Sequence, residues 1–167
     1  MFVPFESLPE NSRIWIYQSS RKFNSGELPI ISDTLSAFTN QWKVHGIPMP
    51  SSFEIRFNQF IILAADENST AASGCSIDDS VRMIKLLGEK LGVELFDRTR
   101  IAFKKENEII TIPLDELKRK YLEGVWSNQT LVVNNLISTK RELSGGWLIP
   151  AEVSWLKRYM PDRAVAR

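Results

Sequence analysis

Only one cysteine and one histidine occur in this chain of 167 residues. A single cysteine excludes an intramolecular disulfide and a cysteine-rich zinc site, and a single histidine excludes metal sites built on histidine pairs. We therefore expect neither a metal centre nor a cofactor. The first residues also lack a basic region followed by a long apolar stretch, so no export signal is expected. A free thiol without such a signal favours the reducing cytoplasm as the location.

An excess of charge of one sign and a long apolar run are also lacking. The 21 basic and 20 acidic residues give a net charge of +1, whereas proteins that bind nucleic acid through phosphate contacts usually have a clear basic excess. The longest apolar run, Phe60 to Ala65, is much shorter than the roughly 20 residues needed to span a bilayer. We therefore expect neither nucleic-acid binding nor a membrane span.

The composition and the hydrophobic patterns that are present predict a single α+β domain over residues 1–167. Hydrophobic residues make up 43% of the chain and charged residues 25%, which is ordinary for a globular protein. The order strand, helix, strand, strand, helix, strand predicts a ferredoxin-like βαββαβ core over about residues 10–105. Its expected strands are 13–19, 53–57, 60–65 and 100–105, and its helices are 31–42 and 77–91. Residues 106–167 are expected to form a C-terminal β/α extension with strands 108–113 and 130–136 and helices 114–124 and 150–160.

Alternation of residue types identifies the second and third strands of this core. Phe53, Ile55 and Phe57 alternate with polar residues, which is typical of a strand with one dry and one wet face. The continuously apolar stretch 60–65 predicts a strand that is covered on both faces. The two form either a hairpin turning at residues 58 and 59 or one long bent strand, and the sequence leaves both open.

The loop over residues 66–76 is the best candidate for a functional site. It joins a buried strand to the clearest helix of the chain, and Ser76 with Asp79 resembles a capping box at the start of that helix. The first amides of a helix have no partner inside it, and with the helix dipole they attract anions. We therefore expect this loop to bind a small anion or a protein partner, although an ordinary structural cap explains the same residues. The candidate ligand-binding residues are Asp66, Ser73, Gly74, Cys75, Ser76 and Asp78.

The lone thiol in this loop gives a second hypothesis, a small enzyme with Cys75 as nucleophile. A thiolate near a helix N-terminus is stabilised, which makes it a better nucleophile. His45 is the only imidazole that can act as its base, and Asp66 is the other residue that can assist it. A free cysteine is more often a small buried hydrophobe, and a buried or half-buried thiol beside a cap is the reading that the sequence favours. Whether the chain is an enzyme is left open.

Several strings give the chain a resemblance that covers nearly its whole length: "LPENSRIWIYQSSR", "SFEIRFNQFIILAADE", "ASGCSIDDSVRMIK", "LFDRTRIAF" and "WLIPAEVSWLKRY". With these it resembles a family of small bacterial proteins that often carry the automatic label "ABC transporter ATPase". The resemblance implies no residue roles. ATPase activity is rejected, because the Walker lysine is lacking, "LSGGW" at 143–147 does not match an LSGGQ-type helix start, and the chain is too short for an ATPase domain.

Overall fold

A computed structural model describes residues 1–161 and contains both helices and antiparallel sheets, which confirms the α+β class. The chain divides into two compact units. Residues 1–97 and 137–142 form the first unit, and residues 98–136 with those from 143 onward form the second. The organisation as a single domain stays a prediction.

The first unit is built on a three-stranded antiparallel sheet with the strand order β1-β5-β4. Its strands are β1 (Arg13–Gln18), β4 (Ser51–Arg56) and β5 (Phe60–Ala65). All six residues of β5, the central strand, are buried, as its unbroken apolar sequence predicts. A small hairpin of β2 (Lys43–Val44) and β3 (Ile47–Pro48) lies between the first helix and β4 along the chain.

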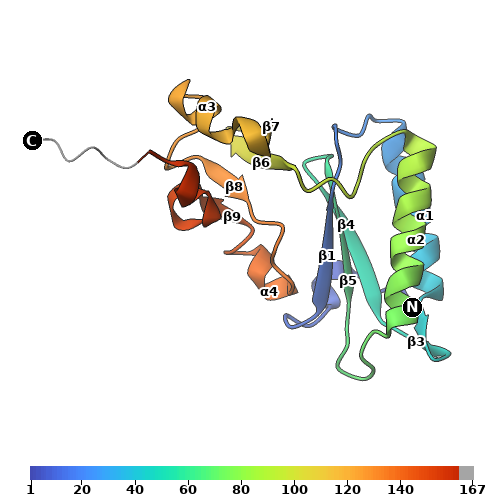
Figure 1. Cartoon of the computed structure of the whole chain (residues 1–167). Coiled ribbons are helices and arrows are strands. Elements are labelled where there is room, and N and C mark those ends of the chain that lie inside the picture. Colours follow the sequence, from blue (N-terminus) through green and yellow to red (C-terminus); the bar gives the residue numbers. More distant parts are fainter. Residues whose placement is uncertain (162–167) are drawn as a thin grey trace, which may run out of the picture. The chain divides into compact units, whose positions relative to one another are not determined.

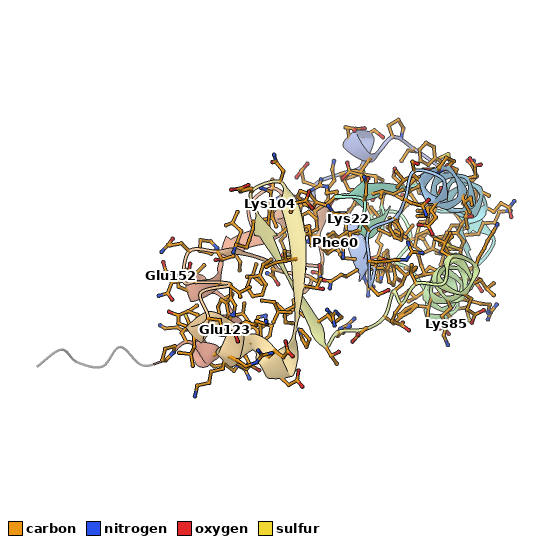
Figure 2. The ribbon with its side chains drawn as sticks, turned by 90° about the horizontal axis from the view of Figure 1, so that it is seen from above. Lys22, Phe60, Lys85, Lys104, Glu123 and Glu152 are labelled. Atoms are coloured by element: carbon orange, nitrogen blue, oxygen red, sulfur yellow. The ribbon has the colours of Figure 1, made fainter. Side chains whose placement is uncertain are left out.

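Two helices lie side by side on one face of this sheet (Figure 1). They are α1 (Glu27–Gln41) and α2 (Gly74–Leu91). The predicted apolar face of α1 is confirmed, since Ile31 and Leu35 are buried in the core that the helices share with the sheet. The side chain of Lys85 lies on the outer side of α2, away from that core (Figure 2). Gly92 ends α2 in the left-handed conformation, with φ 65°, as its position after the last apolar residue predicts.

Strands β4 and β5 form a hairpin, which settles the alternative that the sequence left open. Arg56 pairs with Phe60 across a three-residue connection. Phe57 and Asn58 in this connection both have positive φ, as the central residues of type I′ turns do. The turn forms without a glycine, so its backbone conformation is strained for Phe57.

An ion pair joins the start of α1 to the end of α2. Arg21 donates two hydrogen bonds to the carboxylate of Glu27, at 2.8 and 2.9 Å, and another to the carbonyl oxygen of Leu91 at 3.0 Å. The hydrogen bonds from Arg21 and from the backbone N–H of Asn24 lower the pKa of Glu27 to about 2. The same guanidinium therefore satisfies a carboxylate and one of the last carbonyls of a helix.

The other edge of the sheet, at the start of β1, is covered by residues 137–142 of the same unit. The backbone N–H of Ile14 donates to the carbonyl of Ser138, and the backbone N–H of Lys140 donates to the carbonyl of Ser12. The Lys140 side chain, only 12% exposed, donates to the carbonyl oxygens of Leu8 at 2.6 Å and Glu6 at 3.2 Å. These bonds hold the returning segment against β1 and the turn η1 (Phe5–Ser7).

The second unit contains a four-stranded antiparallel sheet with the order β7-β6-β8-β9. Its strands are β6 (Arg100–Lys105), β7 (Glu108–Pro113), β8 (Leu131–Val133) and β9 (Leu148–Pro150). The turn η2 (Leu114–Glu116) and the helix α3 (Leu117–Leu122) follow β7. Between β8 and β9 the chain forms the short helix α4 (Lys140–Leu143), of which residues 140–142 belong to the first unit. Phe103, Leu117 and Trp126 are fully buried in the core of this unit.

Two sequence predictions are wrong here. Residues 100–105 are not a fourth strand of the first sheet, because β6 pairs with β7 and β8 instead. Residues 150–160 are not one α-helix: β9 ends at Pro150, and the 3₁₀ turns η3 (Ala151–Val153) and η4 (Trp155–Tyr159) follow. Ser154 interrupts them in an extended conformation.

None of the helices described over residues 1–161 combines the length and apolar composition needed to cross a membrane.

Candidate functional site

The predicted loop leaves the sheet at Asp66 and ends where α2 begins, at Gly74. The carboxylate of Asp66 accepts the backbone N–H of Asn68 at 2.9 Å. The carboxylate of Glu67 accepts the backbone N–H of Ala72 at 2.7 Å and lies 3.7 Å from the guanidinium of Arg13. The two acidic side chains therefore fold the loop onto itself.

The cap of α2 lies one turn earlier than the sequence predicts. Ser73 is the N-cap, and its hydroxyl oxygen accepts the backbone N–H of Ser76 at 3.2 Å. Ser76, which is buried, donates its own hydroxyl to the carbonyl of Ser73 at 2.9 Å. The predicted capping box of Ser76 with Asp79 is wrong, because Asp79 lies in the second turn and pairs with Arg82 at 3.4 Å. Gly74 and Cys75 consequently belong to the helix.

Part of the helix N-terminus stays open to solvent. Within residues 1–161, the backbone N–H groups of Ser73, Gly74 and Cys75 have no hydrogen-bond partner. One carboxylate lies beside this end, since Glu67 accepts the backbone N–H of Ala72, the residue that precedes the cap Ser73. Its negative charge opposes the attraction that the helix dipole exerts on an anion.

The structure corrects the prediction for the only thiol. Cys75 is exposed, not buried or half-buried beside the cap. Trp42, at the end of α1, donates its indole N–H to the carbonyl of Ser76 at 2.9 Å, so the end of α1 does lie beside the start of α2. His45 lies three residues further on, exposed in the β2–β3 turn with φ 52°. Among the described residues, no hydrogen bond joins the side chains of Cys75 and His45 to each other or to any other group.

The acidic residues of this region do not converge. Within residues 1–161, no three His, Cys, Asp or Glu side chains come together as a ligand set for a metal ion. The structure therefore brings Ser73, Gly74, Cys75 and Ser76 together in the first turn of α2, leaves Asp66 in the loop and Asp78 on the helix surface, and does not pair His45 with Cys75.

A second feature of the first unit is the outer edge of β4, defined as the backbone groups of Phe53 and Ile55 that point away from β5. β4 is an edge strand. Along an antiparallel ladder, hydrogen-bonded pairs of residues alternate with pairs that are not hydrogen-bonded. Asp66 donates its backbone N–H to the carbonyl of Pro50 at 2.8 Å, so Pro50 and every second residue after it are hydrogen-bonded positions. Residues 52, 54 and 56 therefore bond to β5, and the N–H and C=O groups of residues 51, 53 and 55 point outward.

The chain's own N-terminal segment forms backbone hydrogen bonds with only the first of these outward residues, and the ring of Phe2 also packs against that of Phe53, with centroids 6.0 Å apart. Ser51 donates its N–H to Met1 and accepts that of Val3, each at 3.0 Å. Pro4 then leads into the 3₁₀ turn η1, so the pairing ends there. Within residues 1–161, the outward N–H and C=O groups of Phe53 and Ile55 have no hydrogen-bond partner.

The side chains of residues 53–56 alternate between the two faces of the sheet. Phe53 and Ile55 are partly buried and pack against the core beneath the helices. Glu54 and Arg56 lie on the opposite face and form an ion pair of 2.7 Å, with side chains 27% and 34% exposed. Lysine, proline and bulges, which commonly protect edge strands, are lacking at residues 53–55.

Comparisons of the chain with protein-family models, with curated proteins and with solved structures find no match. The geometry of the two regions is thus the basis for a functional proposal.

Sequence reasoning missed the outer edge of β4. The alternation at residues 53–57 predicts a strand with one polar face, but whether a strand lies at an edge depends on pairing partners distant in the sequence. No local pattern in residues 51–56 distinguishes an edge strand from one that is paired on both sides.

Proposed function

We propose that this chain is a protein-interaction module that recognises an extended polypeptide by pairing it with the outer edge of β4. The observation that supports this is the pair of residues Phe53 and Ile55, whose outward N–H and C=O groups have no partner within residues 1–161. An extended peptide that adds a strand to such an edge gains main-chain hydrogen bonds, and side-chain contacts then give specificity. Each bond contributes about 0.5–1.5 kcal/mol net.

This proposal is favoured over the enzyme hypothesis by the surroundings of Cys75. A nucleophile is commonly activated by a base within hydrogen-bond reach, and neither His45 nor any other side chain within residues 1–161 hydrogen-bonds to Cys75. It is favoured over an anion site at α2 because the carboxylate of Glu67 already lies beside that helix end. As part of the same proposal, the module works in the reducing cytoplasm, where an exposed Cys75 stays a free thiol.

The test is an amide-resolved NMR titration with a probe peptide of alternating threonine and valine, capped at both ends and flanked by lysine. The probe is expected to shift the amide resonances of Phe53 and Ile55 most strongly. A matched control peptide carries N-methyl groups on alternate residues, cannot donate the same hydrogen bonds, and is expected to leave these resonances unchanged.

A protein variant completes the test. Ile55→Pro removes the outward N–H without removing a bond to β5, because that N–H takes no part in the ladder. It is expected to bind the probe peptide at least tenfold more weakly. Probe binding that is equal for both peptides, or that shifts only the α2 N-terminus, contradicts the proposal.

A further inference from the structure

We infer that the strand that occupies the outer edge of β4 is the same strand of a second copy of this chain. The inference rests on the function proposed above and names its partner. Pairing two copies about a twofold axis joins their three-stranded sheets into one six-stranded sheet with the order β1-β5-β4-β4-β5-β1.

The alternation of inward and outward backbone groups along β4 restricts the register of this pairing. Only the outward residues, which have odd numbers in β4, can exchange backbone hydrogen bonds with the second copy. A twofold axis at residue 53 is blocked, since it would place residue 55 of the second copy at Ser51, where Val3 and Met1 are already bound. Axes at residue 54 and at residue 55 remain.

Charge selects between these two registers. An axis at residue 54 places Glu54 directly opposite Glu54 of the second copy, at a closely spaced pair where like charges are destabilising. An axis at Ile55 places Glu54 opposite Arg56 of the second copy, and Arg56 opposite Glu54 of the second copy. Together with the ion pair of 2.7 Å within each strand, this forms a cluster of four alternating charges.

The register about Ile55 also fits the apolar face and the ends of the strand. Ile55 lies opposite Ile55 of the second copy and exchanges two backbone hydrogen bonds with it, on the face where both side chains pack against their own cores. The incoming strand reaches its turn at residues 57–59 as it approaches Ser51, so it stops where the N-terminal segment begins. A net charge of +1 adds little repulsion between copies.

The test uses charge reversal and sedimentation velocity over a wide range of protein concentration. Wild-type protein is expected to show a reversible monomer–dimer equilibrium. Glu54→Arg and Arg56→Glu each turn two attractive cross-strand pairs into repulsive ones, and each variant is expected to dimerise about tenfold more weakly. The double reversal Glu54→Arg/Arg56→Glu is expected to restore the wild-type dissociation constant.

Mixing the two single variants gives the sharpest outcome. One strand then carries two arginines and the other two glutamates, so the mixture is expected to form heterodimers more tightly than either variant self-associates. The matched control is the exposed pair of Asp79 and Arg82 on α2, whose reversal, singly or together, is expected to leave the dimer unchanged. Thermal unfolding of every variant, monitored by circular dichroism, checks that each is folded.

The inference is overturned if wild-type protein is monomeric at all concentrations, if its dimer is indifferent to reversal at residues 54 and 56, or if the mixed variants do not associate. The proposed function is judged separately. If the protein is monomeric but the amides of Phe53 and Ile55 still respond to the threonine–valine probe, the proposed interaction function stands and only the second copy is excluded as the partner. If the protein is monomeric and these amides do not respond to the probe, both proposals are contradicted.

Discussion

Replacing Ser73 by alanine tests the position of the α2 cap, which decides whether Gly74 and Cys75 belong to the helix or to the loop. The hydroxyl of Ser73 is the acceptor for the backbone N–H of Ser76, at 3.2 Å. Alanine at an N-cap costs about 1 kcal/mol, because one amide of the first turn loses its partner. For a chain of this length, that corresponds to a fall of roughly 2–4 °C in the melting temperature.

The assay is urea denaturation followed by circular dichroism and tryptophan fluorescence, compared with Asp79→Ala as the matched control. Asp79 is largely exposed, and its one ion pair, with Arg82, joins two exposed side chains. Its removal is expected to change the free energy of unfolding by less than about 0.5 kcal/mol. Ser73→Asp, which keeps an acceptor at the cap, is expected to retain the wild-type stability.

The opposite ranking of the two variants would contradict a helix cap at Ser73. If Asp79→Ala were the more destabilising variant and Ser73→Ala were neutral, the helix would begin at Ser76 as its sequence suggests. Gly74 and Cys75 would then belong to the loop.

Three further predictions concern other parts of the first unit. The pKa of Glu27 is about 2 in the folded protein, against an ordinary 4.5, so its ionised form contributes stability above about pH 4.5 that is lost as the pH falls toward 2. The free energy of unfolding of Glu27→Gln, measured over the same pH range, is expected to lack this loss, and a pH dependence equal to that of the wild type contradicts the prediction. Lys140→Met leaves two backbone carbonyls without a charged donor and is expected to cost about 2 kcal/mol in urea unfolding; a neutral result excludes the proposed role in holding residues 137–142. Cys75, being exposed, is expected to react with one equivalent of a thiol reagent in the folded protein, and labelling that needs denaturant contradicts the structure.

Local patterns predicted the elements that depend on neighbours along the chain. The apolar spacing of α1 and α2 and the glycine at the end of α2 gave these helices correctly, because periodicity and caps are set within a few residues. The position of the α2 cap was missed by one turn, since "SGCS" offers two serines and only tertiary packing buries Ser76 and leaves Ser73 at the cap.

Features that depend on distant partners were not predictable from one sequence. Residues 100–105 have the pattern of a strand, and the pattern contains nothing to say that they pair with β7 and β8. The return of residues 137–142 to β1 joins segments more than a hundred residues apart. At residues 150–160 the apolar spacing favoured a helix, but the extended Ser154 divides the segment into two 3₁₀ turns.

Amide hydrogen exchange, resolved by residue, tests most directly whether the outer edge of β4 is open in the monomer. In dilute protein, Glu54, whose N–H is bonded within the sheet, is expected to be protected, while Ile55 exchanges at nearly the rate of an unstructured amide. At higher protein concentration, Ile55 is expected to gain protection and Glu54 to change little. An Ile55 amide that is already protected in dilute, monomeric protein would contradict an open outer edge on β4.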